Sequence, residues 1–359
     1  MRPARVLINL DALRHNLAVI RQHAPDSKVL AVVKADAYGH GLVRVAAALQ
    51  QADGFGVACI DEAEQLRAAG IKQKILLLEG PYAADELPLI HKLQLDIVIH
   101  TPEQLAWLAA CKPAVACNVW LKVDTGMHRL GFPAQDFSKT LAAISAQDKH
   151  INSLHLMSHL ATANEPNSEL AQEQISRFAD LARDLTYPKS LANSAAVLAW
   201  PDSHYDWVRP GLILYGVSPI EGTRASDYGL QAVMTLESEL IAVKQLRRGD
   251  AVGYGATWSC PEDMLVGIVA AGYGDGFPRH ADATASLLVN GKRCAIVGKA
   301  SMDMLAVDLR SCPDAAVGAK VQLWGPDLPL EELAQHAATV PYQILCAVHK
   351  RLRFIEHGR

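Results

Sequence analysis

The stretch KVLAVVKADAYGHG, from Lys28 to Gly41, decides how the first part of this chain folds. Its aliphatic and β-branched residues predict a short buried strand, and the glycines that follow predict a turn. Lys34 stands where the strand ends. Burial there disfavours the charged form of the amine, so we expect a neutral lysine that can form a Schiff base. A surface lysine that merely follows a strand is the alternative, and Tyr38 argues against it by placing a hydroxyl near the amine.

Apolar or β-branched runs recur along the chain up to Gly216, and segments with helical spacing of apolar residues separate most of them. The runs span 28–36, 54–60, 74–80, 95–101, 117–125, 151–161, 190–195 and 207–216. Strands that alternate with helices pair in parallel. We therefore predict an α/β fold, a (β/α)8 TIM barrel, with functional groups at the carboxyl ends of its strands. A doubly wound open sheet is the alternative.

The helical segments between these runs include 42–51, 61–70, 101–110 and 168–185. Asp61 and Thr101 precede apolar periodic stretches and are predicted N-caps. Gly70 follows such a stretch and is predicted at the C′ position, where a left-handed residue ends a helix.

The pattern changes after about residue 230. The segments 239–255, 264–277, 285–310 and 320–325 are typical of strands, with no long helix between most of them. Asn290-Gly291 predicts a two-residue type I′ hairpin. We predict a barrel domain over 1–230 and a mainly antiparallel β domain over 231–359. Residues 1–10, which hold the run ARVLINL, fit either domain.

Composition excludes several classes of protein. The chain has 359 residues, half of them hydrophobic, and a net charge of −4, which argues against a nucleic-acid or anionic-membrane partner. No run is long enough to span a membrane, and the N-terminus has no secretory signal. Seven scattered cysteines without a CxxC pair favour free thiols in the cytoplasm, and no metal site is indicated.

Polar residues follow several of the predicted barrel strands, so one barrel mouth would unite side chains from distant parts of the sequence. This set consists of Lys34, Lys122, Arg129, His159, Asn193, Ser194, Arg209 and Gly211. Their convergence predicts a cofactor site.

The motifs around these residues closely resemble those of the alanine racemases, pyridoxal-phosphate enzymes with a fold-type III barrel. The resemblance spans the chain through AVVKADAYGHG, WLKVDTGMHRLGF, MSHLATA, NSAAVL, VRPGLILYG, VGYGATW, AGYGDGFPR and GKASMDMLAVD. It implies an isomerase that interconverts L- and D-alanine, with pyridoxal 5′-phosphate bound to Lys34. It also implies a homodimer with shared active sites. D-Alanine supply for peptidoglycan and alanine catabolism are both compatible roles.

The resemblance assigns the cofactor contacts. Its phosphate would be held by Tyr38, Ser194, the Gly211 and Leu212 amides and Tyr342, with His159 and Asn193 also beside the cofactor. Arg209 would face the pyridine nitrogen, and a guanidinium cannot give its proton to a pyridine, so the ring stays largely unprotonated. That arrangement would limit transamination.

The resemblance also implies two bases on opposite faces of the substrate. Lys34 would act on D-alanine, and Tyr254 of the second subunit on L-alanine, with His159 and Arg209 as a relay that activates the phenol. The substrate carboxylate would contact Arg129 and the Met302 amide. Four further residues are implied in support. Lys122, which is carbamylated in many members, would hold Arg129. Tyr273 and Arg279 would line the substrate path, and Asp303 lies beside Met302.

Other functions remain open from the residues alone. A racemase for serine, lysine or a broader set would use the same cofactor. A decarboxylase of the related barrel fold would place an acidic residue where Arg209 stands. A non-catalytic pyridoxal-phosphate carrier would lack both the β domain and Tyr254.

Overall fold

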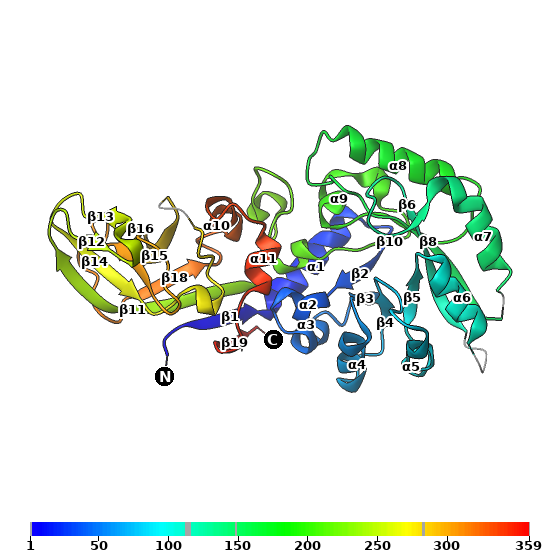
Figure 1. Cartoon of the computed structure of the whole chain (residues 1–359), viewed down its shortest axis with the longest axis horizontal. Helices are drawn as coiled ribbons and strands as arrows, with labels where there is room; N and C mark the ends of the chain where they lie inside the picture. The colour runs from blue at the N-terminus through cyan, green and yellow to red at the C-terminus, as the bar shows by residue number, and fades with distance from the viewer. Residues whose placement is uncertain (1, 112–115, 148, 282–283, 359) are drawn as a thin grey trace.

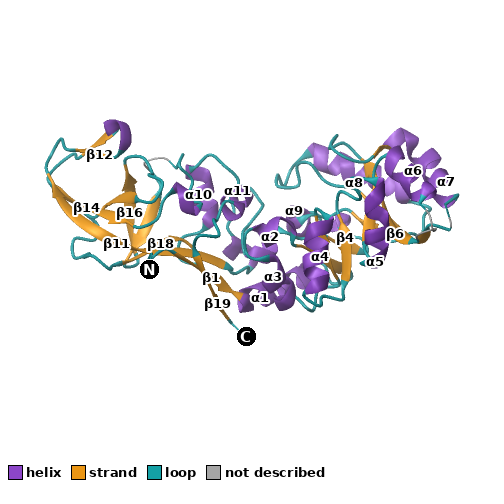
Figure 2. Ribbon diagram, turned by 60° about the horizontal axis from the view of Figure 1, so that its bottom comes forward, coloured by secondary structure: helices purple, strands orange, loops and turns teal. Residues whose placement is uncertain are grey.

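The computed structural model describes residues 2–111, 116–147, 149–281 and 284–358. Figure 1 shows two bodies side by side: a barrel of strands and helices, and a smaller body made mainly of strands. Figure 2 shows helices around the barrel strands, whereas α10 (Leu330–His336) and α11 (Pro341–Cys346) lie between the two bodies. No helix in the described ranges is long and apolar enough to cross a membrane.

Within the described residues, eight parallel strands close into a ring. They are β2 (Lys28–Val32), β3 (Gly54–Val57), β4 (Lys74–Leu77), β5 (Asp96–Ile99), β6 (Cys117–Asp124), β8 (Ile151–Met157), β9 (Lys189–Ser190) and β10 (Trp207–Val208). Pairing of β10 with β2, in which Trp207 lies opposite Lys28, closes the ring. A short strand, β7 (Phe132–Pro133), lies beside β6. The predicted (β/α)8 barrel is confirmed, and the open sheet is excluded.

In this body α1 precedes β2, and the other helices follow the barrel strands in chain order. They are α1 (Leu10–His23), α2 (Lys34–Tyr38), α3 (Leu42–Ala48), α4 (Ile60–Ala68), α5 (Leu87–Lys92), α6 (Pro102–Ala110), α7 (Phe137–Ser145), α8 (Glu169–Ala182) and α9 (Ser194–Ala199). Short 3-10 helices occur at η1 (Ala84–Glu86), η2 (Ala134–Asp136), η3 (Pro201–Ser203), η4 (Leu212–Tyr215), η5 (Ala225–Tyr228), η6 (Tyr254–Ala256) and η7 (Tyr273–Asp275).

Two of the three predicted helix ends are confirmed. The Thr101 side chain accepts a hydrogen bond from the Gln104 amide at 3.3 Å and caps α6. Gly70 has a φ of +82° just beyond α4. The prediction for Asp61 is wrong, because α4 begins at Ile60 and Cys59 is the N-cap. Asp61 lies in the first turn instead, where a carboxylate is still favoured by the helix dipole.

Side chains fill the barrel interior. Leu30, Leu76, Val98, Trp120, Met157 and Trp207 form one buried cluster to which six of the eight strands contribute. At the amino ends of the strands, Lys74 contacts Asp96 at 2.5 Å, and Asp96 also accepts a hydrogen bond from the Trp120 indole at 2.9 Å. This end of the barrel is therefore closed, which leaves the carboxyl end as the mouth.

The second body is built around a closed ring of antiparallel strands. The ring consists of β11 (Met234–Leu246), β14 (Met264–Val269), β17 (Leu305–Asp308), β16 (Lys292–Val297), β15 (Ser286–Val289) and β18 (Lys320–Trp324). A hairpin, β12 (Ala251–Val252) with β13 (Trp258–Ser259), projects from it. Asn290 and Gly291 have φ values of +47° and +79° between β15 and β16, so the predicted type I′ hairpin is confirmed.

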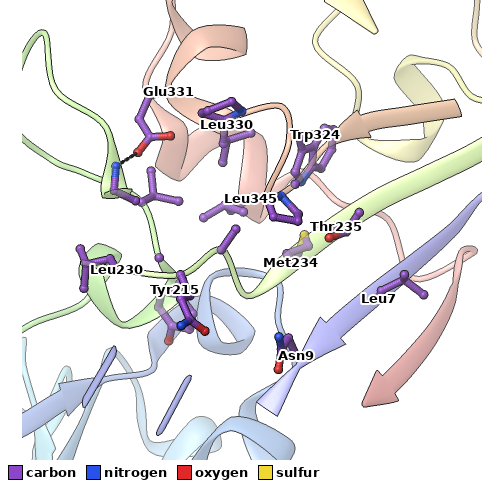
Figure 3. Close-up of a pocket in the computed structure, with 18 of the residues that line it drawn as sticks. Leu7, Asn9, Tyr215, Leu230, Met234, Thr235, Trp324, Leu330, Glu331 and Leu345 are labelled. Carbon is purple, nitrogen blue, oxygen red and sulfur yellow. Dashed lines mark hydrogen bonds between the residues drawn. The ribbon is translucent and has the colours of Figure 1, made fainter. Parts of the chain in front are cut away.

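Both chain ends contribute to this second body. The strand β1 (Arg5–Asn9) pairs antiparallel with β11 and parallel with β19 (Arg353–His357). A cavity of about 550 Å³ lies at the junction of the two bodies, between Tyr215 of the barrel side and Trp324 of β18 (Figure 3). Beside it, the Glu331 carboxylate accepts hydrogen bonds from the amides of Ser218 at 2.8 Å and Ala225 at 2.9 Å. These bonds tie α10 to the barrel and fix the position of the C-terminal helices.

Candidate active site

Lys34 begins a left-handed turn rather than an ordinary helix. Ala35, Asp36, Ala37 and Tyr38 all have φ between +51° and +54°. Each non-glycine residue in this conformation costs about 1–2 kcal/mol. The turn is held from outside: Glu62 accepts a hydrogen bond from the Ala35 amide at 2.7 Å. Such strain is typical of functional sites, where the surrounding structure imposes the backbone conformation.

The Lys34 amine points toward a carboxylate. Its Nζ donates a hydrogen bond to Oε1 of Glu79 at 3.2 Å, and the Lys34 side chain is 36% exposed. The expected burial of this amine is therefore wrong. The strand buries Val32 and Val33, but the lysine lies beyond them at the open mouth.

Arg209 is buried at the centre of the mouth. Its guanidinium donates hydrogen bonds to Ser190 Oγ and to the Ser158 carbonyl, both at 2.6 Å, and to Nδ1 of His159 at 3.3 Å. Burial lowers the pKa of Arg209 to about 10, so it stays cationic at neutral pH. Burial, followed by the charges of Arg209 and Lys122, lowers the pKa of His159 well below its ordinary value. The imidazole is therefore neutral.

Lys122 lies on β6 near the other cations. It is buried, and burial together with the charges of Arg209 and Arg129 lowers its pKa to about 8. Arg129 is exposed, and its positive charge acts on both Lys122 and His159. An unmodified Lys122 therefore repels Arg129 rather than holding it.

Hydroxyls and a backbone amide gather at the end of β10. The Gly211 amide donates to Ser194 Oγ at 2.8 Å. A Cβ at Gly211 would lie 2.5 Å from the Tyr38 hydroxyl oxygen, so only glycine leaves room for this arrangement. Tyr342 of α11 packs against Tyr38, with ring centroids 5.5 Å apart. The group can donate several hydrogen bonds to a small anion such as a phosphate.

Two further predicted residues border this group. Asn193 is the N-cap of α9, and its side chain accepts a hydrogen bond from the Ala196 amide at 3.0 Å. Leu212 begins η4 and is fully buried. A cavity of about 660 Å³ beside the mouth is lined in part by His159, Asn193, Leu212 and Tyr342. The mouth thus has room for a small ligand.

The remaining predicted residues lie on the second body. Tyr273 and Met302 belong to two loops that the structure joins, since the Gly274 amide donates to the Met302 carbonyl at 2.9 Å. Arg279 lies over the Tyr273 ring at 5.4 Å, and Asp303 contacts Arg351 at 2.8 Å. The Met302 side chain is 53% exposed.

Tyr254 is also exposed, at 67%, and belongs to η6 between β12 and β13. Figure 1 places the β12–β13 hairpin at the end of the second body that is remote from the barrel. Within one chain, the fold therefore does not bring Tyr254 to Lys34.

Comparisons with known proteins match this architecture. A model described as the N-terminal domain of alanine racemase matches residues 8–219, and one described as its C-terminal domain matches residues 233–356. The chain is 48% identical over 348 residues to an alanine racemase of Nitrosococcus oceani, covering 97% of this chain and 98% of that protein. This chain belongs to the alanine racemase family. An alanine racemase of Coxiella burnetii is 45% identical over 362 residues, covering 99% of each chain.

Solved alanine racemases have the same fold. The crystal structure of a biosynthetic alanine racemase from Pseudomonas aeruginosa superposes with a TM-score of 0.96 at 43% identity and covers all of both chains. The alanine racemase of Acinetobacter baumannii gives a TM-score of 0.95 at 35% identity, covering 99% of this chain and 100% of that one. The family resemblance inferred from the motifs is confirmed.

Sequence reasoning missed one charged residue in the mouth of this family member. Glu79 directly follows the strand run KILLL and contacts Lys34, yet it was not among the predicted residues. The available signal was its place, because polar residues at the carboxyl end of a barrel strand face the mouth. An isolated acidic residue before a glycine such as Gly80 is also typical of an ordinary turn, so the sequence alone does not single out Glu79.

Proposed function

We propose that this chain interconverts L- and D-alanine with pyridoxal 5′-phosphate bound covalently to Lys34. The observation that carries the proposal is the barrel mouth itself. There, the Lys34 amine, the Arg209–His159 pair and the hydroxyls near Gly211 come together from distant parts of the sequence. Fold similarity alone would not support the proposed reaction, since the same barrel fold hosts many different chemistries.

The donors near Gly211 fit the phosphate of the cofactor. Burial raises the pKa of Tyr38 well above its ordinary value, and it raises the pKa of Tyr342 to about 12. Both phenols therefore keep their protons and can donate hydrogen bonds. Ser194, with the Gly211 and Leu212 amides, completes the group that we assign to the phosphate, and Asn193 fixes the start of α9 beside it.

Arg209 is suited to face the ring nitrogen of the cofactor. When bound, pyridoxal phosphate acts as an electron sink that weakens the Cα–H bond of an amino acid joined to it. Because the Arg209 guanidinium keeps its proton at neutral pH, it does not protonate the pyridine as a carboxylic acid would. We expect this residue to favour return of the proton to Cα over transamination.

Two chains are required to place both bases. Lys34 would remove or return the α-proton on one face of the substrate, and Tyr254 of a second copy would do so on the other. The exposure of Tyr254 and Met302 supports a homodimer in which each β domain completes the mouth of the other chain. We assign Arg129 and the Met302 amide to the substrate carboxylate, with Tyr273, Arg279 and Asp303 beside the access path.

Further assignments follow from this activity. We assign Lys122 to the support of Arg129. This role requires that Lys122 lose its positive charge. We assign a barrel domain to 1–230, with β1 packed in the second body, and a β domain to 231–359; the start of β11 at Met234 supports the boundary. A cytoplasmic enzyme that supplies D-alanine for peptidoglycan, or that feeds alanine catabolism, would suit the proposed reaction.

The test is direct. Purified protein loaded with pyridoxal phosphate is incubated with L-alanine, and optical rotation is followed until it reaches zero. Lys34→Ala should lose the cofactor absorbance band and the reaction, and Lys28→Ala is the matched control. Lys28 begins β2, the strand that Lys34 follows, and lies over the Trp207 ring at 5.4 Å. Racemisation that survives in Lys34→Ala would contradict the proposal.

A further inference from the structure

Glu79 is a charged residue of the barrel mouth to which the proposed function assigns no role. Its Oε1 accepts the hydrogen bond from Lys34 Nζ at 3.2 Å. Its Oε2 is buried and has no hydrogen-bond partner among the described residues. A buried carboxylate oxygen without a donor costs free energy, and such local costs are typical of functional sites. This unpartnered oxygen and the contact with Lys34 point to a role for Glu79 at the mouth.

The backbone around Glu79 is fixed by buried contacts. The Glu79 carbonyl accepts a hydrogen bond from the Gln104 side chain at 3.1 Å and lies 3.0 Å from Nε2 of His100. Gly80 has a φ of +68°, and a Cβ there would lie 2.1 Å from the Val98 carbonyl oxygen. Only glycine permits this turn, so the chain after β4 holds the carboxylate in one place.

The charges around the Lys34 amine differ in sign. Lys34, Arg209 and Arg129 all lower the pKa of Lys122, whereas Glu79 raises it, so these groups share one electrostatic environment. Lys34 also acts on the neutral His159 and on the thiol of Cys346. An ammonium at Lys34 is thus repelled by several cations and attracted by the carboxylate that contacts it. Because Coulomb energy falls with distance, the contact at 3.2 Å is the strongest of these influences.

We propose that Glu79 is a positioning residue that orients the Lys34 amine and stabilises its ammonium form. This inference rests on the proposed racemase function. When neutral Lys34 removes the α-proton, the Cα–H bond breaks, its electron pair stays with the substrate, and a new N–H bond forms at Nζ. Glu79 accepts a hydrogen bond from that ammonium. Return of the proton to Cα restores the neutral amine.

The first experiment measures the amine without the reaction. Full-length protein is stripped of cofactor, and its lysines are methylated reductively with formaldehyde and a borane at neutral pH. Mass spectrometry follows the peptide that contains Lys34. The hydrogen bond to Glu79 restrains the Lys34 amine, so Lys34 should be labelled roughly threefold faster or more in Glu79→Gln than in wild type. Lys28 in the same sample reports the general labelling rate.

The control variant is Glu103→Gln. Glu103 is an exposed residue in the first turn of α6, so the substitution removes the same charge without touching Lys34. If Glu79→Gln fails to fold, Glu79→Asp is used instead. Its side chain is one methylene shorter, so the carboxylate lies farther from Lys34 and the labelling rate of Lys34 should be intermediate. Labelling of Lys34 at the wild-type rate in the Glu79 variant that folds overturns the inference.

The second experiment uses the loaded enzyme. Weaker stabilisation of the ammonium slows proton removal by Lys34, so Glu79→Gln should lower kcat for D-alanine about tenfold and raise its primary deuterium isotope effect. Because the two enantiomers have equal free energies, kcat/KM must fall equally in both directions. An unchanged isotope effect would contradict the role in catalysis. If wild-type protein does not racemise alanine, the proposed function fails, while the labelling comparison still tests the ion pair.

Discussion

Nδ1 of His159 accepts a hydrogen bond from the guanidinium of Arg209 at 3.3 Å. Arginine can only donate, so the acceptor nitrogen of the imidazole carries no proton and the remaining proton lies on Nε2. This pair joins β8 and β10 at the mouth, and it fixes both the charge and the tautomer of the histidine.

The charge state of His159 leads to a prediction about pH. Its pKa is lowered, so the imidazole should stay neutral where an ordinary histidine titrates and should protonate only at lower pH. NMR of the histidine ring protons, with the His159 signal assigned from a His159→Gln variant, measures this. A His159 signal that titrates like that of an ordinary histidine would show that burial and the nearby cations do not act as described.

Gly211 should be essential for cofactor affinity. In Gly211→Ala the new methyl would lie 2.5 Å from the Tyr38 hydroxyl oxygen and would displace the phenol. We expect the Kd for pyridoxal phosphate to rise about tenfold or more, from loss of at least one charge-assisted hydrogen bond. Absorbance titration measures it. Gly318→Ala meets open space, but its φ of +89° strains any side chain, so it controls for a general loss of stability. Equal affinity in the two variants would refute the assignment.

Lys122 should react with carbon dioxide. Its pKa of about 8 leaves a substantial neutral fraction near neutral pH, and a neutral amine forms a carbamate. The carbamate would replace a repelled cation by an acceptor for Arg129. With dissolved CO₂ held constant, uptake should rise as pH increases through about 8, because the lowered pKa frees the amine. Labelling with ¹³C-bicarbonate followed by NMR should give a carbamate signal that Lys122→Met abolishes.

Asp275 should stabilise the loops that carry Tyr273 and Met302. It is fully buried and accepts hydrogen bonds from Arg2 at 2.6 and 2.8 Å and from Arg351 at 2.8 Å. Asp275→Asn removes the charge that both guanidinium groups share. Since these groups are partly solvated, we expect a loss of about 2 kcal/mol in the free energy of unfolding. Urea denaturation measures it, and a loss below experimental error would show that solvent screens the network.

The sequence predicts the barrel and its mouth well because both depend on periodicity. Alternating apolar runs and helical segments favour parallel strands, and once these close into a ring, Lys34, His159 and Arg209 meet at its mouth. The ends of elements are harder: Asp61 is a good capping residue, yet packing starts α4 one residue earlier.

The geometry immediately around Lys34 could not be predicted. Nothing in the sequence Ala35-Asp36-Ala37-Tyr38 favours positive φ, and contacts such as that from Glu62 impose it. The partial exposure of the amine and its pairing with Glu79 likewise depend on how far each side chain extends beyond its strand. Tertiary structure decides both features.

The most direct test of two bases from two chains mixes two inactive variants. Lys34→Ala and Tyr254→Phe are each expected to lose most racemase activity, and they are then unfolded and refolded together. A mixed dimer has one mouth with both residues intact, so activity should recover to about a quarter of the wild-type value. If the mixture stays as inactive as the separate variants, Lys34 and Tyr254 do not act together across a dimer.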